Sequence, residues 1–298
     1  MDARLFEGLS LSVNLFQIDR KGIITEMTSD VPNVYGLSST SVYANYNATQ
    51  TRGLEASLQW ERSVGDWCYS FGGKASSVKT IRKRVNDDLW IYEYQRKAGT
   101  ASDAIWGYDY LGKFTDYDDY LSSPKYDANV QMGDLKYADL DGDGQVNTND
   151  RKVIGHSFPR LVYSVNFSLG WKNLDLYVLG TGRALFDLLL DGDWYQSGWG
   201  DDNYSTFVRD NLGGDYPRLS YVKAEGNFVT SRFWLRRGDW FKIQCAELGY
   251  NMPLRIGNKA GLSSARIFLR GANLFTISGI KDCDPENIYA GVSTDPLY

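Results

Sequence analysis

The 298-residue sequence is poor in the residue types that most often mark a disulfide scaffold, a metal cluster or a catalytic base. Its three cysteines, Cys68, Cys245 and Cys283, are an odd number without C-x-x-C spacing, so neither a disulfide scaffold nor a zinc ribbon fits. The single histidine, His156, excludes a histidine-cluster metal site and leaves only one possible base for a nucleophilic triad. His156 is most simply a turn residue, and we expect no enzyme.

The sequence also has no excess of positive charge and no long apolar run. Thirty-seven acidic residues against 32 basic ones give a net charge of −5, the wrong sign for a nucleic-acid-binding protein. No run of about 18 apolar residues occurs, so we expect no transmembrane helix. Residues 1–6 carry no cationic region followed by an apolar stretch, so we expect no signal peptide in them.

Glycine and aromatic residues are abundant, and they point to an all-β chain. Thirty glycines and an aromatic share of 14% are typical of many strands joined by turns. The clearest alternation puts Tyr163, Val165 and Phe167 on one face and polar residues on the other. The same period of two, strong or weak, predicts about seven strands, at 9–16, 54–60, 67–71, 163–171, 174–184, 239–250 and 265–277.

The predicted connections alternate in length along the chain. They are long at 19–50, 80–162 and 185–237, short at 63–66 and 172–173, and of medium length at 253–264. An antiparallel transmembrane β-barrel sorts its connections in this way, with short periplasmic turns and long extracellular loops. Aromatic residues beside the short connections stand where a membrane-interface girdle would lie: Trp60, Trp67, Trp171 and Tyr250. A β-sandwich also alternates apolar with polar residues and is the alternative that periodicity leaves open.

Residues 139–150 match the spacing of an EF-hand-type calcium loop. Carboxylates at positions 1, 3 and 5, a glycine at 6, a backbone carbonyl at 7 and an acid at 12 would surround one Ca²⁺. The predicted ligands are Asp139, Asp141, Asp143, Gln145 and Asp150. Since the loop has no second copy and no long amphipathic helices around it, we expect a structural Ca²⁺ that fixes a long external loop. The alternative is a hydrogen-bonded turn that holds no metal.

Two long connections carry clusters of aromatic residues. The stretch 101–150 combines eleven aspartates with interleaved aromatic rings, a surface that suits sugars, because rings stack on C–H faces while acids accept from hydroxyls. The candidate ligand-binding residues are Trp106, Tyr108 and Tyr117 here, and Trp194 and Trp199 in the next long connection. The alternative is that these rings pack on one another or on a partner protein.

Several motifs, in this order, resemble the C-terminal barrel of the SusC/RagA family of TonB-linked outer-membrane transporters. They are Gly53-Leu54-Glu55; the calcium-like loop running through Arg151, Val153-Ile154-Gly155 and Pro159 to Trp171-Lys172-Asn173-Leu174-Asp175; Leu235 to Trp240 with Leu248-Gly249-Tyr250 and Pro253; and Arg266-Ile267-Phe268 with Gly271 to Thr276 and Asp284-Pro285-Glu286.

The resemblance implies an outer-membrane barrel of 22 strands, of which residues 1–298 would supply about seven. The family's plug domain and final strand have no counterpart here, so we expect a part of the barrel, truncated at both ends. The implied function is TonB-dependent import of an oligosaccharide or other glycan, or of a peptide. The implied partners are a SusD-like surface lipoprotein, TonB through the plug, and membrane lipid. The alternative from another class is a secreted β-sandwich carbohydrate-binding or glycosidase module with a structural calcium.

Overall fold

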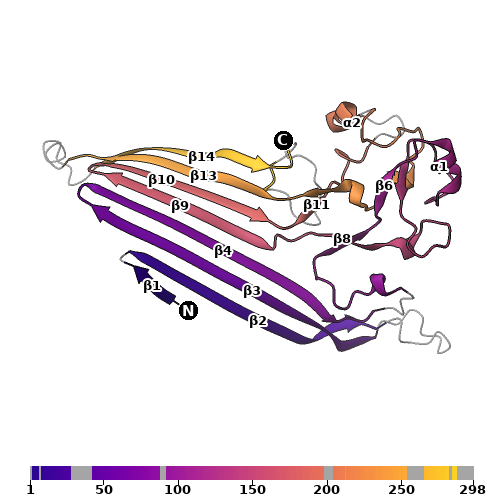
Figure 1. Cartoon of the computed structure of the whole chain (residues 1–298), viewed down its shortest axis with the longest axis horizontal. Coiled ribbons are helices and arrows are strands. Elements are labelled where there is room, and N and C mark those ends of the chain that lie inside the picture. The colour runs from indigo at the N-terminus through magenta and orange to yellow at the C-terminus, as the bar shows by residue number, and fades with distance from the viewer. Residues whose placement is uncertain are drawn as a thin grey trace.

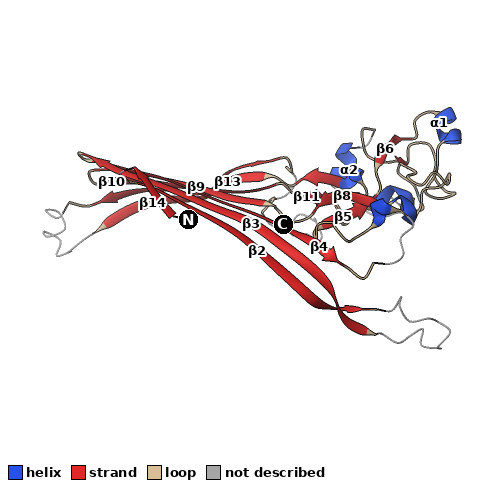
Figure 2. Cartoon of the chain, turned by 60° about the horizontal axis from the view of Figure 1, so that its bottom comes forward, coloured by secondary structure: helices blue, strands red, loops and turns tan. Residues whose placement is uncertain are grey.

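The computed structural model describes residues 2–6, 8–27, 42–87, 92–197, 204–211, 213–253, 265–281 and 284–286. Its main feature is one antiparallel sheet of eight strands in the order β1-β2-β3-β4-β9-β10-β13-β14, a single curved layer (Figures 1 and 2). The strands are β1 (Asp2–Phe6), β2 (Leu9–Glu26), β3 (Tyr43–Val64), β4 (Trp67–Arg84), β9 (Leu161–Trp171), β10 (Leu174–Ala184), β13 (Trp240–Asn251) and β14 (Arg266–Ser278).

The all-β, antiparallel prediction is confirmed, and the β-sandwich alternative is wrong. A sandwich needs two large sheets packed face to face. In the described part of the chain the other six strands form only two-stranded sheets, β5-β8, β6-β7 and β11-β12. The seven predicted strands are present as β2, β3, β4, β9, β10, β13 and β14, and the short β1 adds an eighth.

The first predicted long connection is much shorter than expected, because β2 and β3 extend far into it. Polar side chains continue the pairing of these strands: Gln50 donates to Asp19 Oδ1 at 2.8 Å, and Arg52 Nε donates to Gln17 Oε1 at 3.0 Å. This extension carries no apolar alternation, so periodicity alone could not find it. The connection that remains is 27–42, of which 28–41 lie outside the described residues.

The strand register sorts the side chains of the main sheet onto two different faces. Phe71 lies directly opposite Trp60 on β3 and Phe167 on β9, whereas Lys74, of the other parity, lies opposite Ser57 and Ser164. Because cross-strand partners point to the same side of a sheet, the first row belongs to an apolar face and the second to a polar face. We use these two names below.

The apolar face of the sheet has no covering layer among the described residues. Leu15 and Leu269 are each 76% exposed. Near the short-turn rim the rings of Trp67 and Trp171 stack at a centroid separation of 5.6 Å. Both tryptophans are exposed, as are the other members of the predicted girdle, Trp60 and Tyr250. Hydrophobic side chains arranged in this way suit an apolar surrounding medium.

The described residues of the long connections fold into a separate body at the other end of the strands, which we call the loop module, residues 92–160, 185–197, 204–211 and 213–239 (Figure 2). Its elements are η3 (Glu93–Gln95), β5 (Ala104–Gly107), β6 (Tyr110–Lys113), α1 (Tyr117–Ser122), β7 (Leu135–Tyr137), η4 (Thr148–Asp150), β8 (Lys152–His156), β11 (Asp187–Leu189), α2 (Thr206–Asn211), η5 (Glu225–Phe228), η6 (Arg232–Trp234) and β12 (Leu235–Arg237). No helix in the described ranges is long and apolar enough to cross a bilayer.

The buried core of the chain lies in the loop module and not on the sheet. It joins residues of both long connections: Tyr108, Leu135, Tyr137, Val146, Leu190, Tyr195, Val208, Tyr216, Phe233 and Trp234. A smaller cluster at the junction with the sheet contains Phe186, Leu188, Trp240 and Ile280. The two connections therefore form one packed unit over the loop-side rim.

Candidate functional site

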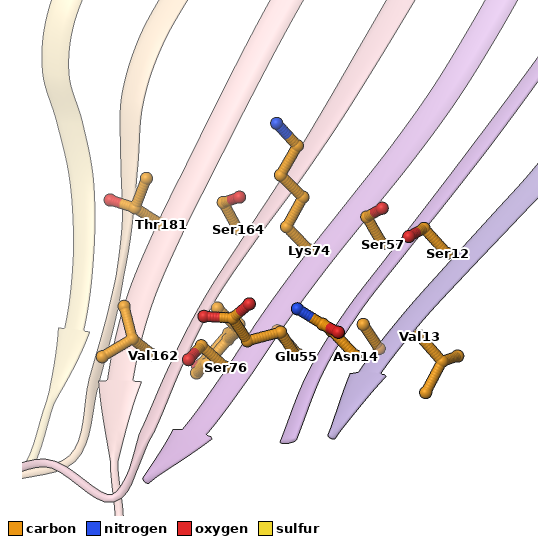
Figure 3. Close-up of a pocket in the computed structure, with 13 residues that line it drawn as sticks. Ser12, Val13, Asn14, Glu55, Ser57, Lys74, Ser76, Val162, Ser164 and Thr181 are labelled. Atoms are coloured by element: carbon orange, nitrogen blue, oxygen red, sulfur yellow. The ribbon is translucent and has the colours of Figure 1, made fainter. Parts of the chain in front are cut away.

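A shallow hollow of about 640 Å³ lies on the polar face, across β2, β3, β4, β9 and β10. Hydroxyl and amide groups from these five neighbouring strands line it (Figure 3). The polar members are Ser12, Asn14, Glu55, Ser57, Lys74, Ser76, Ser164 and Thr181. The register explains this wall, because Ser12, Ser57, Lys74 and Ser164 are successive cross-strand partners.

The hollow carries one cation and one anion, Lys74 and Glu55, so its net charge is near zero. Its other polar groups are hydroxyls and one amide, which both donate and accept hydrogen bonds. This wall suits a large polar solute that exchanges hydrogen bonds with many groups in turn. Alternation within one strand predicts which residues share its polar side, but it does not show that five strands bring such residues together in one hollow.

Further along the polar face, the chain that follows β14 folds back onto β13. Lys242 is 1% exposed, and its Nζ donates to Asp284 Oδ1 at 3.0 Å and to Glu286 Oε2 at 2.7 Å. A buried ammonium needs such carboxylate partners, since an unpaired charge would be costly there. The Asp284-Pro285-Glu286 motif is thus the counterion of a lysine on the wall.

Within the loop module a buried carboxylate joins the two long connections. Asp134, 2% exposed, accepts from Arg218 Nε at 3.1 Å and from Asn227 Nδ2 at 2.9 Å. Asn227 Oδ1 in turn accepts from the backbone N–H of Leu135 at 2.8 Å. Since Arg218 and Asn227 come from the other connection, these bonds fix the two loops against each other.

The predicted calcium loop lies on the surface of this module. Oxygen atoms of Asp139, Asp141 and Asp143 come within 4.8 Å of one another. Gly144 has a φ of +87°, the conformation that the sharp turn at position 6 requires. Its N–H donates to Asp139 Oδ2 at 2.9 Å and lowers the pKa of the Asp139 carboxyl. Three converging carboxylates are the oxygen donors that Ca²⁺ prefers.

The remaining two predicted ligands lie differently. Asp150 is fully buried, and its oxygens accept from the backbone N–H groups of Leu140 at 2.6 Å and Asn147 at 2.7 Å. It lies outside the group of three carboxylates that converge. Gln145 is exposed, and its backbone pairs with that of Lys125 in an isolated parallel β-bridge. Their roles as ligands stay predictions.

The predicted ligand-binding aromatics separate into distinct environments. Tyr108 is buried in the core of the loop module. Its position fits the alternative given above, in which the ring packs on neighbouring rings. Trp194 is half-buried and packs against the same core. Trp106 is half-buried in β5, and Tyr117, on α1, is 63% exposed and stacks on Tyr120. Trp199 lies outside the described residues. Tyr117 therefore has the most surface to offer a ligand.

The sole histidine lies in the loop module, and two of the three cysteines lie on the main sheet. His156 ends β8, and its backbone N–H donates to Asp187 Oδ2 at 3.0 Å. Burial, and then the charge of Arg160, lower the pKa of its imidazole. Cys68 and Cys245 are free thiols on the main sheet. Cys283 lies outside the described residues.

Comparison with known proteins gives matches over almost the whole chain. TonB-dependent receptor P3 of Formosa agariphila is 25% identical over 307 aligned residues, 97% of this chain. TonB-dependent receptor P26 of the same organism is 28% identical over 96% of this chain. The chain spans about 30% of the length of each of these relatives. No family model matches the sequence.

Solved structures with the same fold are similar over nearly all of the chain. The RagAB peptide importer in its "open-open" state superposes with a TM-score of 0.68 at 15% identity, covering 93% of this chain and 30% of the matched chain. The RagAB peptide transporter superposes with a TM-score of 0.68 at 16% identity over 94% of this chain. The curved sheet and its loop module therefore have the fold of part of that assembly.

Proposed function

Because this chain belongs with the TonB-dependent receptors of the outer membrane, we propose that it forms one wall and two external loops of an importer for a large polar nutrient. The wall lines the import path with its polar face, and the loop module stands over the external opening. The segment itself carries out no bond chemistry. The import energy enters through TonB, acting on a plug that the barrel encloses.

The division of the main sheet into two chemically different faces carries this proposal. Strands of a transmembrane barrel alternate lipid-facing and lumen-facing residues, so one face must be apolar and the other polar. Phe71 and Ser57 represent these two faces on neighbouring strands. The aromatic residues at the short-turn rim stand where a periplasmic girdle belongs.

For the solute, we propose an oligosaccharide, with a peptide as the second candidate. The uncharged hydroxyls of the hollow favour a neutral chain of hydroxyl or amide groups over a strongly charged ligand. Tyr117 offers an exposed ring for stacking on a sugar face at the external end. The RagAB structures are those of a peptide importer, which favours the second candidate. A SusD-like lipoprotein would cover the loop module and enclose the solute.

The calcium loop takes a structural role in this proposal. A Ca²⁺ held by Asp139, Asp141 and Asp143 would offset two of the three negative charges of these carboxylates and fix the surface of the loop module. The loop is tied to its surroundings by Tyr94, whose hydroxyl donates to the carbonyl of Asn149 at 2.8 Å. The ion would therefore stiffen a surface that solute or lipoprotein meets.

The proposal is tested by placing one bulky side chain on each face of β3. Ser57→Trp projects an indole into the hollow, and we expect the energised uptake of oligosaccharide by cells to fall by about tenfold or more. Leu58→Trp puts the same indole on the apolar face and is the matched control, with uptake retained. Equal uptake by both variants, at equal amounts of folded receptor in the outer membrane, would refute the import path.

A further inference from the structure

Two arginines on β3 mark the ends of the apolar face. Arg52 and Arg62 have the same parity, and the residues between them on that side are Leu54, Ala56, Leu58 and Trp60. Ten residues of strand span about 33 Å, and a tilt of 35–45° reduces this to a height of about 25 Å, the apolar band of a transmembrane barrel. Arg52 therefore lies at the loop-side boundary of the band, and Arg62 at the short-turn boundary.

Positive charge gathers at the loop-side boundary. Arg52 lies directly opposite Lys79 on β4, and both are exposed. Lys21, also exposed, follows two positions after Asp19 on β2, on the same face. The carboxylate of Asp19 is held by two amides, from Gln17 and Gln50, each at 2.8 Å. This cationic group of Arg52, Lys79 and Lys21 stands out in a chain whose net charge is −5.

The nearby carboxylate of Asp19, which lies close to Arg52 and Lys21, offsets only one of these three positive charges. Like charges directly opposite each other on neighbouring strands destabilise a sheet. Within the described ranges, neither Arg52 nor Lys79 has a carboxylate within the 4.0 Å of an ion pair, and Arg52 Nε bonds only the neutral amide of Gln17. On the polar face, by contrast, Arg266 and Arg270 both pair with Glu247, at 2.7 and 2.6 Å.

We propose that Arg52 and Lys79 hold a phosphate of an outer-leaflet glycolipid of the lipid A type, with Lys21 further along the same face, opposite Ala48. This inference rests on the membrane-spanning orientation proposed above. At this height the side chains lie level with the lipid headgroups, and a guanidinium and an ammonium together match the charge and oxygens of a phosphate monoester. The acyl chains of the same lipid would then cover Leu15 and Leu54 below.

The test counts lipid bound to the purified receptor by native mass spectrometry. The receptor, extracted in mild detergent, is titrated with lipid A and with its dephosphorylated form. We expect a preference for the phosphorylated lipid that falls by about fivefold in Arg52→Gln, by about fivefold in Lys79→Gln, and by about 25-fold in the double variant. Arg62→Gln, on the same strand and face but at the other boundary, is the control and keeps the preference.

Three results would overturn the inference: equal binding of both lipids, an unchanged preference in the double variant, or the same loss in Arg62→Gln. Folding is checked separately, by the heat-dependent shift of the unboiled barrel on a denaturing gel. A double variant that folds, inserts and imports solute but has lost no lipid preference would refute the lipid site and leave the proposed function standing.

Discussion

The ring of Phe16 lies over the backbone of Gly53, so that a Cβ added to Gly53 would stand 2.2 Å from the ring atom Cζ. The two residues are direct partners on β2 and β3, on the polar face. The ring covers a stretch of strand that carries no side chain of its own, and the glycine is required by this close approach. The Gly53-Leu54-Glu55 motif thus has a packing explanation.

Gly53→Ala is therefore expected to destabilise the barrel wall. Overpacking of this kind costs about 1–3 kcal/mol, because Phe16 must leave its position. The free energy of unfolding, measured by urea titration of the receptor in lipid vesicles, should fall by that amount. Gly73→Ala on β4 is the matched control, since a Cβ there meets no atom within 4 Å. Equal stability of the two variants would contradict the packing of Phe16 on Gly53.

Asp134→Ala is expected to loosen the loop module and leave the sheet intact. The substitution removes the acceptor of Arg218 and Asn227, and an unsatisfied buried amide costs about 1–3 kcal/mol. Hydrogen exchange of the amides in β6 and β7 should accelerate, with no change in β9. Glu225→Ala, which breaks the surface ion pair with Lys223, should have no measurable effect. Unaltered exchange in the Asp134 variant would show that the two loops do not depend on this network.

Calcium is expected to protect the segment 134–156 from proteolysis. Binding to the native loop alone stabilises it by mass action, so cleavage should slow as Ca²⁺ is added and speed up again with chelator. Asp141→Ala should abolish this dependence, whereas Asp118→Ala, an exposed acid on α1, should retain it. The same protection in the Asp141 variant as in the parent would exclude the predicted site.

Acidification is expected to weaken the junction between the loop module and the sheet. Burial and Arg160 lower the pKa of His156, so the unfolded state binds more protons than the folded state around and below pH 6.5. The contribution of the neutral imidazole is present above that pH and is lost as pH falls through the lowered pKa. The charged groups around it include Asp103, Asp187 and Lys79. The protection of the β8 amides, corrected for the intrinsic pH dependence of exchange, should decrease between pH 7 and pH 5, and less so in His156→Gln; an identical profile of protection against pH would contradict this.

The sequence predicts the wall well, because its signal is local. Alternation over 163–171 is a property of one strand, and it decides which side chains of β9 share a face. The loop-side parts of β2 and β3 lack this alternation, because polar residues such as Asp19 and Arg52 also occupy the face that is apolar elsewhere. Their pairing is fixed by contacts between two strands, which no single strand displays.

The loop module could not be predicted, for a related reason. Its core depends on contacts such as that of Leu135 with Asn227, which lie 92 residues apart in sequence. An aromatic residue in a polar stretch gives the same sequence pattern whether its ring binds a ligand or packs on a distant ring. The sequence therefore could not show that Tyr108 is buried and Tyr117 exposed. The predicted calcium loop differs, because its proposed ligands lie within twelve residues and so form a local pattern in the sequence.

The most direct test of the account follows the two faces along β3 in the membrane. With Cys68, Cys245 and Cys283 replaced by serine, single cysteines at positions 54–60 carry a nitroxide label, and its collisions with oxygen and with a water-soluble nickel complex are measured. The account predicts a period of two, with oxygen favoured at 54, 56, 58 and 60 and nickel at 55, 57 and 59. Nickel access at every position would mean that the apolar face meets water, and would contradict the transmembrane wall.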